Sequence, residues 1–236
     1  MTARLSLSRT ALVAALAIAG ACGRPRVPST SVAVSAALTR FETEIRAFED
    51  SDRVKPPAPN GIVFVGSSSI RLWPDLRADF PGRNVIQRGF GGSRLDEVLY
   101  YAPRMVLPYK PQLIVLYTGE NDVAEGRTPT QIFSDYKSFV ALVQRHLSAA
   151  LIAYISIKPS PSRWQLVDRM RETNSMIERY ALTHPQLAYI DVFTPMIGPS
   201  GRPRAELFVS DSLHMNRDGY ALWRRLLTPW LVTKVY

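Results

Sequence analysis

Short apolar runs alternate with longer amphipathic stretches along most of the chain. Five runs rich in Val, Ile, Leu and Tyr have the length of buried strands; they lie at residues 62–65, 84–87, 113–117, 151–157 and 188–191. Stretches with apolar residues at helical spacing flank them, at residues 36–48, 94–101, 130–146, 163–183 and 216–227. This alternation predicts an α/β fold: a three-layer α/β/α sandwich around a mostly parallel five-stranded sheet.

Glycines and small polar residues follow three of the predicted strands. The first strand leads into Gly66-Ser67-Ser68-Ser69, the second into the glycine-rich residues 88–93, and the third into residues 118–122. In parallel sheets, ligands bind beyond the carboxyl ends of the strands. We therefore expect these three segments to form one shared site.

The first 21 residues have the pattern of a secretory signal peptide. Arg4 and Arg9 precede an apolar run at residues 11–19, which ends in the small pair Gly20-Ala21. The run is too short to favour a membrane-spanning helix. We expect residues 1–21 to be removed and the mature protein to work outside the cytoplasm.

Cys22 is the single cysteine of the chain and directly follows this segment. Residues 19–22 resemble the lipobox of bacterial lipoproteins, which implies lipid attachment at Cys22 and a periplasmic or cell-envelope location, with plain secretion as the alternative. Residues 22–35 contain prolines and several Ser and Thr, as in a tether. Residues 36–236 are then expected to form one globular domain, with the membrane reached only through the lipid.

Composition and charge add few constraints. The 236 residues are 46% hydrophobic and 21% charged, as in ordinary globular domains. The formal charge of +9 becomes +7 once Arg4 and Arg9 are removed. The remaining basic residues are dispersed and match no nucleic-acid-binding motif, so no nucleic-acid partner is expected. No His-x-x-x-His, cysteine pair or Asp-rich loop predicts a metal site, and we expect no cofactor.

A serine cluster after a strand raises the question of a nucleophile. A serine hydroxyl reacts when a base, most often histidine oriented by a carboxylate, takes its proton. His146 and His184 lie at predicted helix ends and are expected to be structural. His214 lies in a loop, three residues after Asp211, where one turn of backbone can bring the carboxylate to the imidazole.

Four blocks of the chain together resemble the SGNH hydrolases, also called GDSL-type esterases. In order they are VGSSSI, GFGGS, GENDV and DSLH, and they extend from Val65 to His214. The resemblance implies a flavodoxin-like three-layer fold and hydrolysis of carboxylic esters. The glycine block lacks the third glycine of a dinucleotide-binding loop, and VGSSSI lacks the last glycine of the Gly-x-Ser-x-Gly elbow.

The same resemblance assigns roles around the nucleophile. It makes Ser68 the nucleophile, His214 the general base and acid, and Asp211 the residue that orients His214. Ser67 stands where the family usually has Asp, and Ser67 remains a minor rival nucleophile. Ser69 is expected to cap the following helix.

The resemblance also implies an oxyanion hole built from the Ser68 and Gly92 backbone N–H groups and the Asn121 side-chain amide. Glu120 and Asp122 are expected to shape the loop around Asn121, and Asp191 to be structural.

Substrate choice is less constrained by the sequence. Arg163 and Trp164 follow the fourth predicted strand, where Arg163 can meet an anionic group and Trp164 can stack on a sugar or acyl chain. The sequence contains no long apolar lid segment, which favours a short acyl or acetyl ester, on a carbohydrate for example. A lysophospholipase or thioesterase of the same family is the alternative, and a non-catalytic cell-envelope binding lipoprotein is a third.

Overall fold

The computed structural model of the chain describes residues 39–234. The predicted signal peptide, Cys22 and the tether lie outside the described residues. Within residues 39–234, no helix combines the length and the apolar character needed to cross a membrane.

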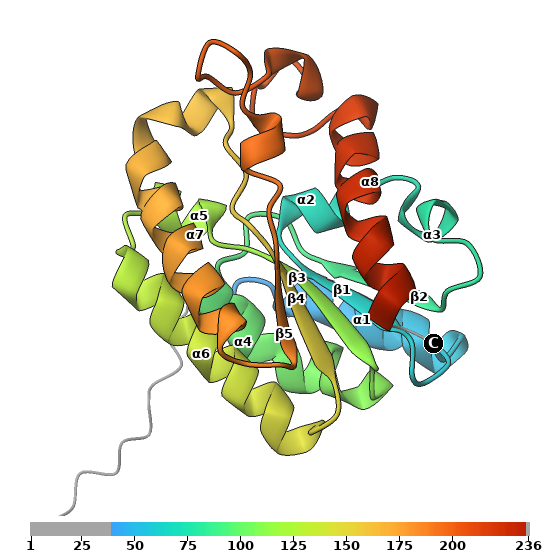
Figure 1. Cartoon of the computed structure of the whole chain (residues 1–236). Helices are drawn as coiled ribbons and strands as arrows, with labels where there is room; N and C mark the ends of the chain where they lie inside the picture. Colours follow the sequence, from blue (N-terminus) through green and yellow to red (C-terminus); the bar gives the residue numbers. More distant parts are fainter. Residues whose placement is uncertain (1–38, 235–236) are drawn as a thin grey trace, which may run out of the picture. The chain divides into compact units, whose positions relative to one another are not determined.

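A single parallel sheet of five strands forms the centre of the described domain (Figure 1). Its strand order is β2-β1-β3-β4-β5, the flavodoxin-like order, and all neighbouring strands pair in parallel. The predicted α/β fold with a parallel five-stranded sheet is thus confirmed. The strands are β1 (Ile62–Gly66), β2 (Val85–Gly89), β3 (Leu113–Tyr117), β4 (Leu151–Ile155) and β5 (Leu187–Ile190).

Helices cover both faces of the sheet, and in Figure 1 α8 (red) lies on the opposite side from α6 and α7. One face carries α1 (Glu42–Val54), α4 (Leu95–Met105), α6 (Pro129–His146) and α7 (Val167–Leu182). The other carries α2 (Ser68–Arg71), α3 (Leu76–Asp79) and α8 (Arg217–Lys234). The short helix α5 (Glu120–Ala124) and the 3-10 turns η1 (Leu107–Tyr109), η2 (Pro161–Leu166), η3 (Thr194–Met196) and η4 (Ala205–Leu207) complete the described elements.

Alternate strand residues build two separate cores, because successive side chains of a strand point to opposite faces. Val63 and Val65 of β1 pack toward α4, whereas Ile62 and Phe64 pack on the face of α8. On the α8 face, aromatic rings join distant elements: the Phe64 and Phe80 centroids lie 5.4 Å apart. The Trp73 and Trp223 centroids lie 6.0 Å apart, so α8 is packed directly behind the turn that follows β1.

The first helix differs from the predicted one at residues 36–48. Within the described residues it runs from Glu42 to Val54. The apolar periodicity ends at Phe48, but ion pairs support the polar last turns: Arg104 contacts Glu49 at 2.7 Å, and Arg88 contacts Asp52 at 2.5 Å. Such long-range pairs leave no periodic signal in the sequence.

The helix predicted at residues 163–183 begins later than expected. Residues 161–166 form a 3-10 turn in which Arg163 has non-helical φ and ψ of −118° and 19°, and α7 begins at Val167. The apolar spacing alone did not reveal this separate turn, which places Arg163 beside the carboxyl ends of the strands.

Candidate active site

The turn after β1 is shaped by glycine. Gly66 has a φ of +140°, and a Cβ atom there would lie 1.8 Å from the carbonyl oxygen of Tyr117. The next residue, Ser67, donates its backbone N–H to that same oxygen at 3.0 Å. The chain therefore turns tightly against β3 and places Ser68 at the first position of α2.

Ser68, His214 and Asp211 form a connected row of side chains. Nε2 of His214 lies 3.1 Å from Oγ of Ser68, and Nδ1 of His214 lies 2.6 Å from Oδ2 of Asp211. Because the carboxylate accepts the Nδ1 proton, it leaves Nε2 unprotonated and facing the serine hydroxyl. The structure thus brings together the three residues expected as a triad.

The loop that carries this pair is tightly closed. A β-bridge joins Phe208 to Met215, and Oδ1 of Asp211 accepts the backbone N–H groups of Leu213 and His214 at 2.8 and 2.9 Å. Burial opposes ionisation of Asp211, but the hydrogen bonds from the His214 side chain and from these N–H groups lower its pKa to about 2. The carboxylate is therefore charged at neutral pH and can stabilise an imidazolium.

The three consecutive serines have different environments. Ser67 occupies the N-cap position of α2, yet its buried side chain makes no capping hydrogen bond. Ser69 lies inside α2 and is buried, so the expectation that Ser69 caps this helix is wrong. The helix begins at Ser68, two residues earlier than a Ser69 cap would require, and of the three serines Ser68 has its hydroxyl beside His214.

Gly92 lies in the loop after β2 with a φ of +81°, a conformation that favours glycine. Its carbonyl oxygen accepts a hydrogen bond from Arg40 at 3.2 Å, and Arg40 also contacts the buried Glu97 at 2.7 Å. Arg40 was missed by sequence reasoning, because it lies before the first strand and contacts Gly92 only in the folded chain. This contact holds the Gly92–Ser93 peptide, which directly follows the peptide that carries the Gly92 N–H.

Asn121 lies at the start of α5, at the end of the neighbouring strand β3. Its Nδ2 donates to the Ser93 carbonyl oxygen at 3.0 Å, and its Oδ1 accepts from Arg163 at 3.0 Å. One N–H bond of the amide remains available for another acceptor. The loops after β1, β2 and β3 therefore bring Ser68, Gly92 and Asn121 to one edge of the sheet, because Gly66 is in register with Gly89 and Tyr117.

Asp122, next to Asn121, connects the loops after β2 and β3. Both of its carboxylate oxygens accept the backbone N–H of Leu95 at 3.1 Å, at the first residue of α4. Arg127 lies 3.6 Å away. Burial raises the pKa of Asp122 to about 7. Asp122 therefore shapes the loop around Asn121. Asp191 is structural in a different loop, where its carboxylate accepts the Thr194 N–H at 3.0 Å.

The raised pKa of Asp122 predicts a dependence of stability on pH. A carboxyl group with a folded-state pKa above its unfolded value stabilises the fold at low pH, and this contribution is lost as pH rises from about 4 through about 7. Asp122→Asn keeps an acceptor for Leu95 and does not titrate. Relative to the variant, the parent should lose on the order of 3 kcal/mol of unfolding free energy over that range. Urea unfolding at pH 4, 6 and 8 measures this difference; a constant difference would contradict the prediction.

Arg163 and Trp164, the predicted substrate contacts, have different surroundings. Arg163 is turned toward Asn121. The Trp164 ring is half-buried, and the guanidinium carbons of Arg171 and Arg202 lie 5.6 and 5.5 Å from its centroid. Trp164 therefore packs with cations of its own chain, and only Arg163 contacts a residue of the expected oxyanion hole.

A buried ion pair behind Asn121 was not predicted. Nζ of Lys158 lies 2.6 Å from Oε2 of Glu120, and both side chains are almost fully buried. Glu120 follows β3 and Lys158 follows β4, so opposite charges at the ends of two adjacent strands were the available signal. Sequence reasoning had instead assigned Glu120 to shaping its loop.

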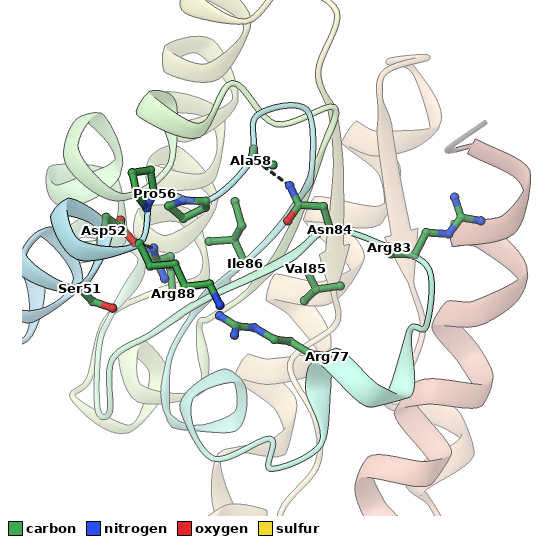
Figure 2. A pocket seen from close by; sticks show the side chains of 12 residues that line it. Ser51, Asp52, Pro56, Ala58, Arg77, Arg83, Asn84, Val85, Ile86 and Arg88 are labelled. Atoms are coloured by element: carbon green, nitrogen blue, oxygen red, sulfur yellow. Dashed lines mark hydrogen bonds and ion pairs between the residues drawn. The ribbon is translucent and has the colours of Figure 1, made fainter.

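A separate hollow is lined by residues of β2 and of the segment that follows α1 (Figure 2). It has a volume of about 350 Å³ and is lined partly by basic residues. Arg88 is hydrogen-bonded there to Tyr109 and paired with Asp52, and in Figure 2 Arg77 and Arg83 point in different directions. None of the predicted site residues lines this hollow.

The chemistry open to the site follows from its groups. A serine hydroxyl beside a carboxylate-oriented imidazole, with backbone and amide N–H donors on neighbouring loops, suits acyl transfer. Ser68 is half-buried, and the His214 and Asp211 side chains are 29% and 47% exposed, so the row of side chains opens to solvent. Among residues 39–234, no group of three His, Cys, Asp or Glu side chains is arranged to hold a metal ion.

Comparison with known proteins gives a family and a fold. The model of the GDSL-like lipase/acylhydrolase family matches residues 58–222. No curated protein matches the sequence significantly.

Solved structures of proteins from several organisms are similar to the chain, including the three that follow. A Streptococcus pneumonia protein described as a platelet activating factor has a TM-score of 0.73 and 20% identity, covering 82% of this chain and 94% of that one. A GDSL-like lipase from Bacteroides thetaiotaomicron has a TM-score of 0.65 and 23% identity, covering 83% and 97%. An acetylxylan esterase from Geobacillus stearothermophilus has a TM-score of 0.59 and 13% identity, covering 73% and 94%. At these identities the likeness establishes a shared fold.

Proposed function

The chain belongs to the GDSL-like lipase/acylhydrolase family, and on that premise we propose that it is a serine esterase acting on short-chain acyl or acetyl esters. The observation that carries this proposal is the 3.1 Å separation between Nε2 of His214 and Oγ of Ser68, in a site open to solvent. A binding protein without catalysis would have no need for a base held against this one hydroxyl. The expected binding lipoprotein therefore gains no support from the site.

In the proposed first half-reaction, Oγ of Ser68 attacks the ester carbonyl carbon while Nε2 of His214 takes the hydroxyl proton. The carbonyl π electrons move to oxygen, and the oxyanion accepts hydrogen bonds from the backbone N–H groups of Ser68 and Gly92 and from the Asn121 amide. Collapse of the tetrahedral intermediate breaks the bond to the leaving alcohol. His214 returns its proton to the departing oxygen, which leaves an acyl group on Ser68.

The second half-reaction uses the same groups with water as the nucleophile. His214 takes a proton from water as the water oxygen attacks the acyl carbon, and the oxyanion forms again in the same place. Collapse breaks the bond to Oγ of Ser68, which recovers its proton from His214. Asp211 stays ionised throughout, because its pKa of about 2 keeps it a carboxylate beside the imidazolium.

The preference for a small acyl group rests on two features. The catalytic side chains open to solvent, and the sequence contains no long apolar segment to cover a long acyl chain. An acetylxylan esterase among the structures of similar fold makes acetylated carbohydrate a reasonable first substrate to test. Lysophospholipids and thioesters are the alternative substrates within the same family.

A panel of substrates tests this proposal. The purified protein would be assayed with p-nitrophenyl acetate, butyrate and octanoate, with acetylated glycans, and with long-chain lysophospholipids. We expect the specificity constant to be highest for acetate or butyrate, with acetate released from a glycan. Good turnover of lysophospholipids with no release of acetate would reverse the order, and inertness on every substrate would contradict the esterase proposal.

We further propose that the protein is exported and anchored by a lipid at Cys22, a residue outside the described part of the chain. The support is the sequence alone: a basic start, an apolar run and small residues before the cysteine. Incorporation of labelled palmitate by the parent but not by Cys22→Ser would support the anchor. Secretion of an unlabelled protein would contradict it.

A further inference from the structure

A buried charge cluster centres on Glu120, the residue before Asn121 of the proposed oxyanion hole, and takes no part in the mechanism above. Three side chains converge on the Glu120 carboxylate: Nζ of Lys158 at 2.6 Å, the hydroxyl of Tyr117 at 2.9 Å and the hydroxyl of Ser160 at 2.7 Å. All four side chains are buried. Burying an ion pair carries a large desolvation cost, and well-packed apolar residues often stabilise a fold equally well. Stability alone therefore does not account for this buried pair.

Arg163 connects this cluster to the site. Its NH1 atom lies 4.0 Å from Oε1 of Glu120 and donates a hydrogen bond to Oδ1 of Asn121 at 3.0 Å. The preceding residue, Ser162, donates its backbone N–H to the Ser212 carbonyl oxygen at 3.0 Å, which ties the same 3-10 turn to the loop of His214. Arg163 thus lies between the amide of Asn121 and the histidine loop.

The charges of the cluster determine the ionisation state of Glu120. Lys158 and Arg163 carry two positive charges against the single negative charge of Glu120. Burial favours the neutral form of Glu120, but the charges of Lys158 and Arg163 outweigh it and hold the pKa of the carboxyl below its usual value. Glu120 is therefore a charged anchor for Arg163 at neutral pH.

The orientation of the Asn121 amide matters, because its two ends are opposite in function. The oxygen end repels a developing oxyanion, whereas the NH₂ end stabilises it, and the two ends have nearly the same shape. Two contacts select one orientation: the Arg163 guanidinium can only donate and requires Oδ1, while the Ser93 carbonyl oxygen can only accept and requires Nδ2. Without Arg163, only the Ser93 contact would oppose a flip or a tilt of the amide.

We propose that Arg163, anchored by the buried Lys158–Glu120 pair, is a positioning residue that fixes the Asn121 amide with an N–H bond toward the reacting carbonyl. The inference rests on the proposed esterase function and assigns Arg163 a task other than the substrate contact expected from sequence. Arg163 acts on the reaction only through Asn121. Its removal should therefore matter only while the Asn121 amide is present.

A double-mutant cycle with p-nitrophenyl butyrate tests this dependence in the full-length protein. Arg163→Met should lower kcat roughly 10- to 50-fold with KM changed less than about twofold, because a misdirected donor weakens transition-state stabilisation and leaves ground-state binding intact. Asn121→Ala should lower kcat by about 100-fold or more. The double variant should match Asn121→Ala within about twofold.

Two further variants serve as controls. Arg163→Lys keeps one donor for Oδ1 and should recover kcat to within about fivefold of the parent. Arg169→Met removes an exposed arginine from the first turn of α7, which follows the 3-10 turn of Arg163, and should leave kcat unchanged. Multiplicative losses in the cycle, an effect confined to KM, or full activity of Arg163→Met would each overturn the assignment.

A second measurement does not depend on activity. The side-chain NH₂ signals of Asn121, identified by their absence from the Asn121→Ala spectrum, should shift and exchange faster with water in Arg163→Met than in the parent. Unchanged signals would overturn the positioning role, even in an active enzyme. If the parent hydrolyses no ester and yet these signals respond to Arg163→Met, the esterase function fails and the positioning of Asn121 stands.

Discussion

Replacement of Ser68 by alanine is expected to lower ester hydrolysis by roughly 10⁴-fold or more, because it removes the hydroxyl that forms the acyl intermediate. The reason is geometric: Oγ of Ser68 is the hydroxyl in contact with Nε2 of His214. Hydrolysis of p-nitrophenyl acetate, measured with purified parent and variant at equal concentration, gives the ratio directly. Thermal unfolding should be nearly unchanged, since Ser68 is a half-buried residue at the first position of a four-residue helix.

Ser67→Ala is the matched control for this experiment. The Ser67 side chain is buried and makes no capping hydrogen bond, while the backbone N–H that holds the turn against Tyr117 is kept in alanine. Its activity should stay within about threefold of the parent, in keeping with an ordinary small substitution. Loss of activity in Ser67→Ala with activity retained in Ser68→Ala would show that the nucleophile is misassigned.

Gly66→Ala is expected to produce the largest loss of stability among glycine-to-alanine substitutions near the site. Its Cβ would lie 1.8 Å from the Tyr117 carbonyl oxygen, and the φ of +140° is one that alanine rarely adopts. Strain and overpacking together should reduce the free energy of unfolding by about 4 kcal/mol. Relief of the clash would separate β1 from β3 at their carboxyl ends and displace Ser68, so activity should fall as well. Urea unfolding followed by circular dichroism measures the change in the free energy of unfolding.

Gly82→Ala separates strain from clash. Gly82 also has a positive φ, of +73°, but a Cβ there meets no atom within 4 Å. Its cost should be only about 1 kcal/mol, the usual penalty of a left-handed conformation for an L-residue, with activity retained. Equal losses in the two variants would show that the contact with Tyr117 does not set the effect.

Patterns that depend on neighbouring residues could be predicted from the sequence. The five strands are short, apolar and separated by helical periodicity, so their positions agree with the structure to within about two residues. The candidate side chains Ser68 and Asn121 could be placed together because each follows a strand of the same parallel sheet. His214 and Asp211 could be paired because three residues separate them.

Features that depend on long-range contacts could not be predicted. The last turns of α1 are polar, and pairing with Arg104 and Arg88 stabilises them in the folded chain. The contact of Arg163 with Asn121 depends on a 3-10 turn that apolar spacing did not distinguish from the start of α7. The role of Ser69 was misjudged for a related reason, since three identical hydroxyls do not indicate which one begins the helix.

The separation of the catalytic partners along the chain has a consequence for folding. Ser68 and His214 are 146 positions apart, and the loop of His214 is connected to α8, whose Trp223 packs on Trp73 behind the nucleophile. The first three strands can pair before the segment with the His214 loop and α8 is present, but at that stage His214 is not held beside Ser68. Hydrolytic activity therefore reports that the His214 loop and α8 have packed onto the sheet, and during synthesis the nucleophile stays unactivated until this segment has left the ribosome.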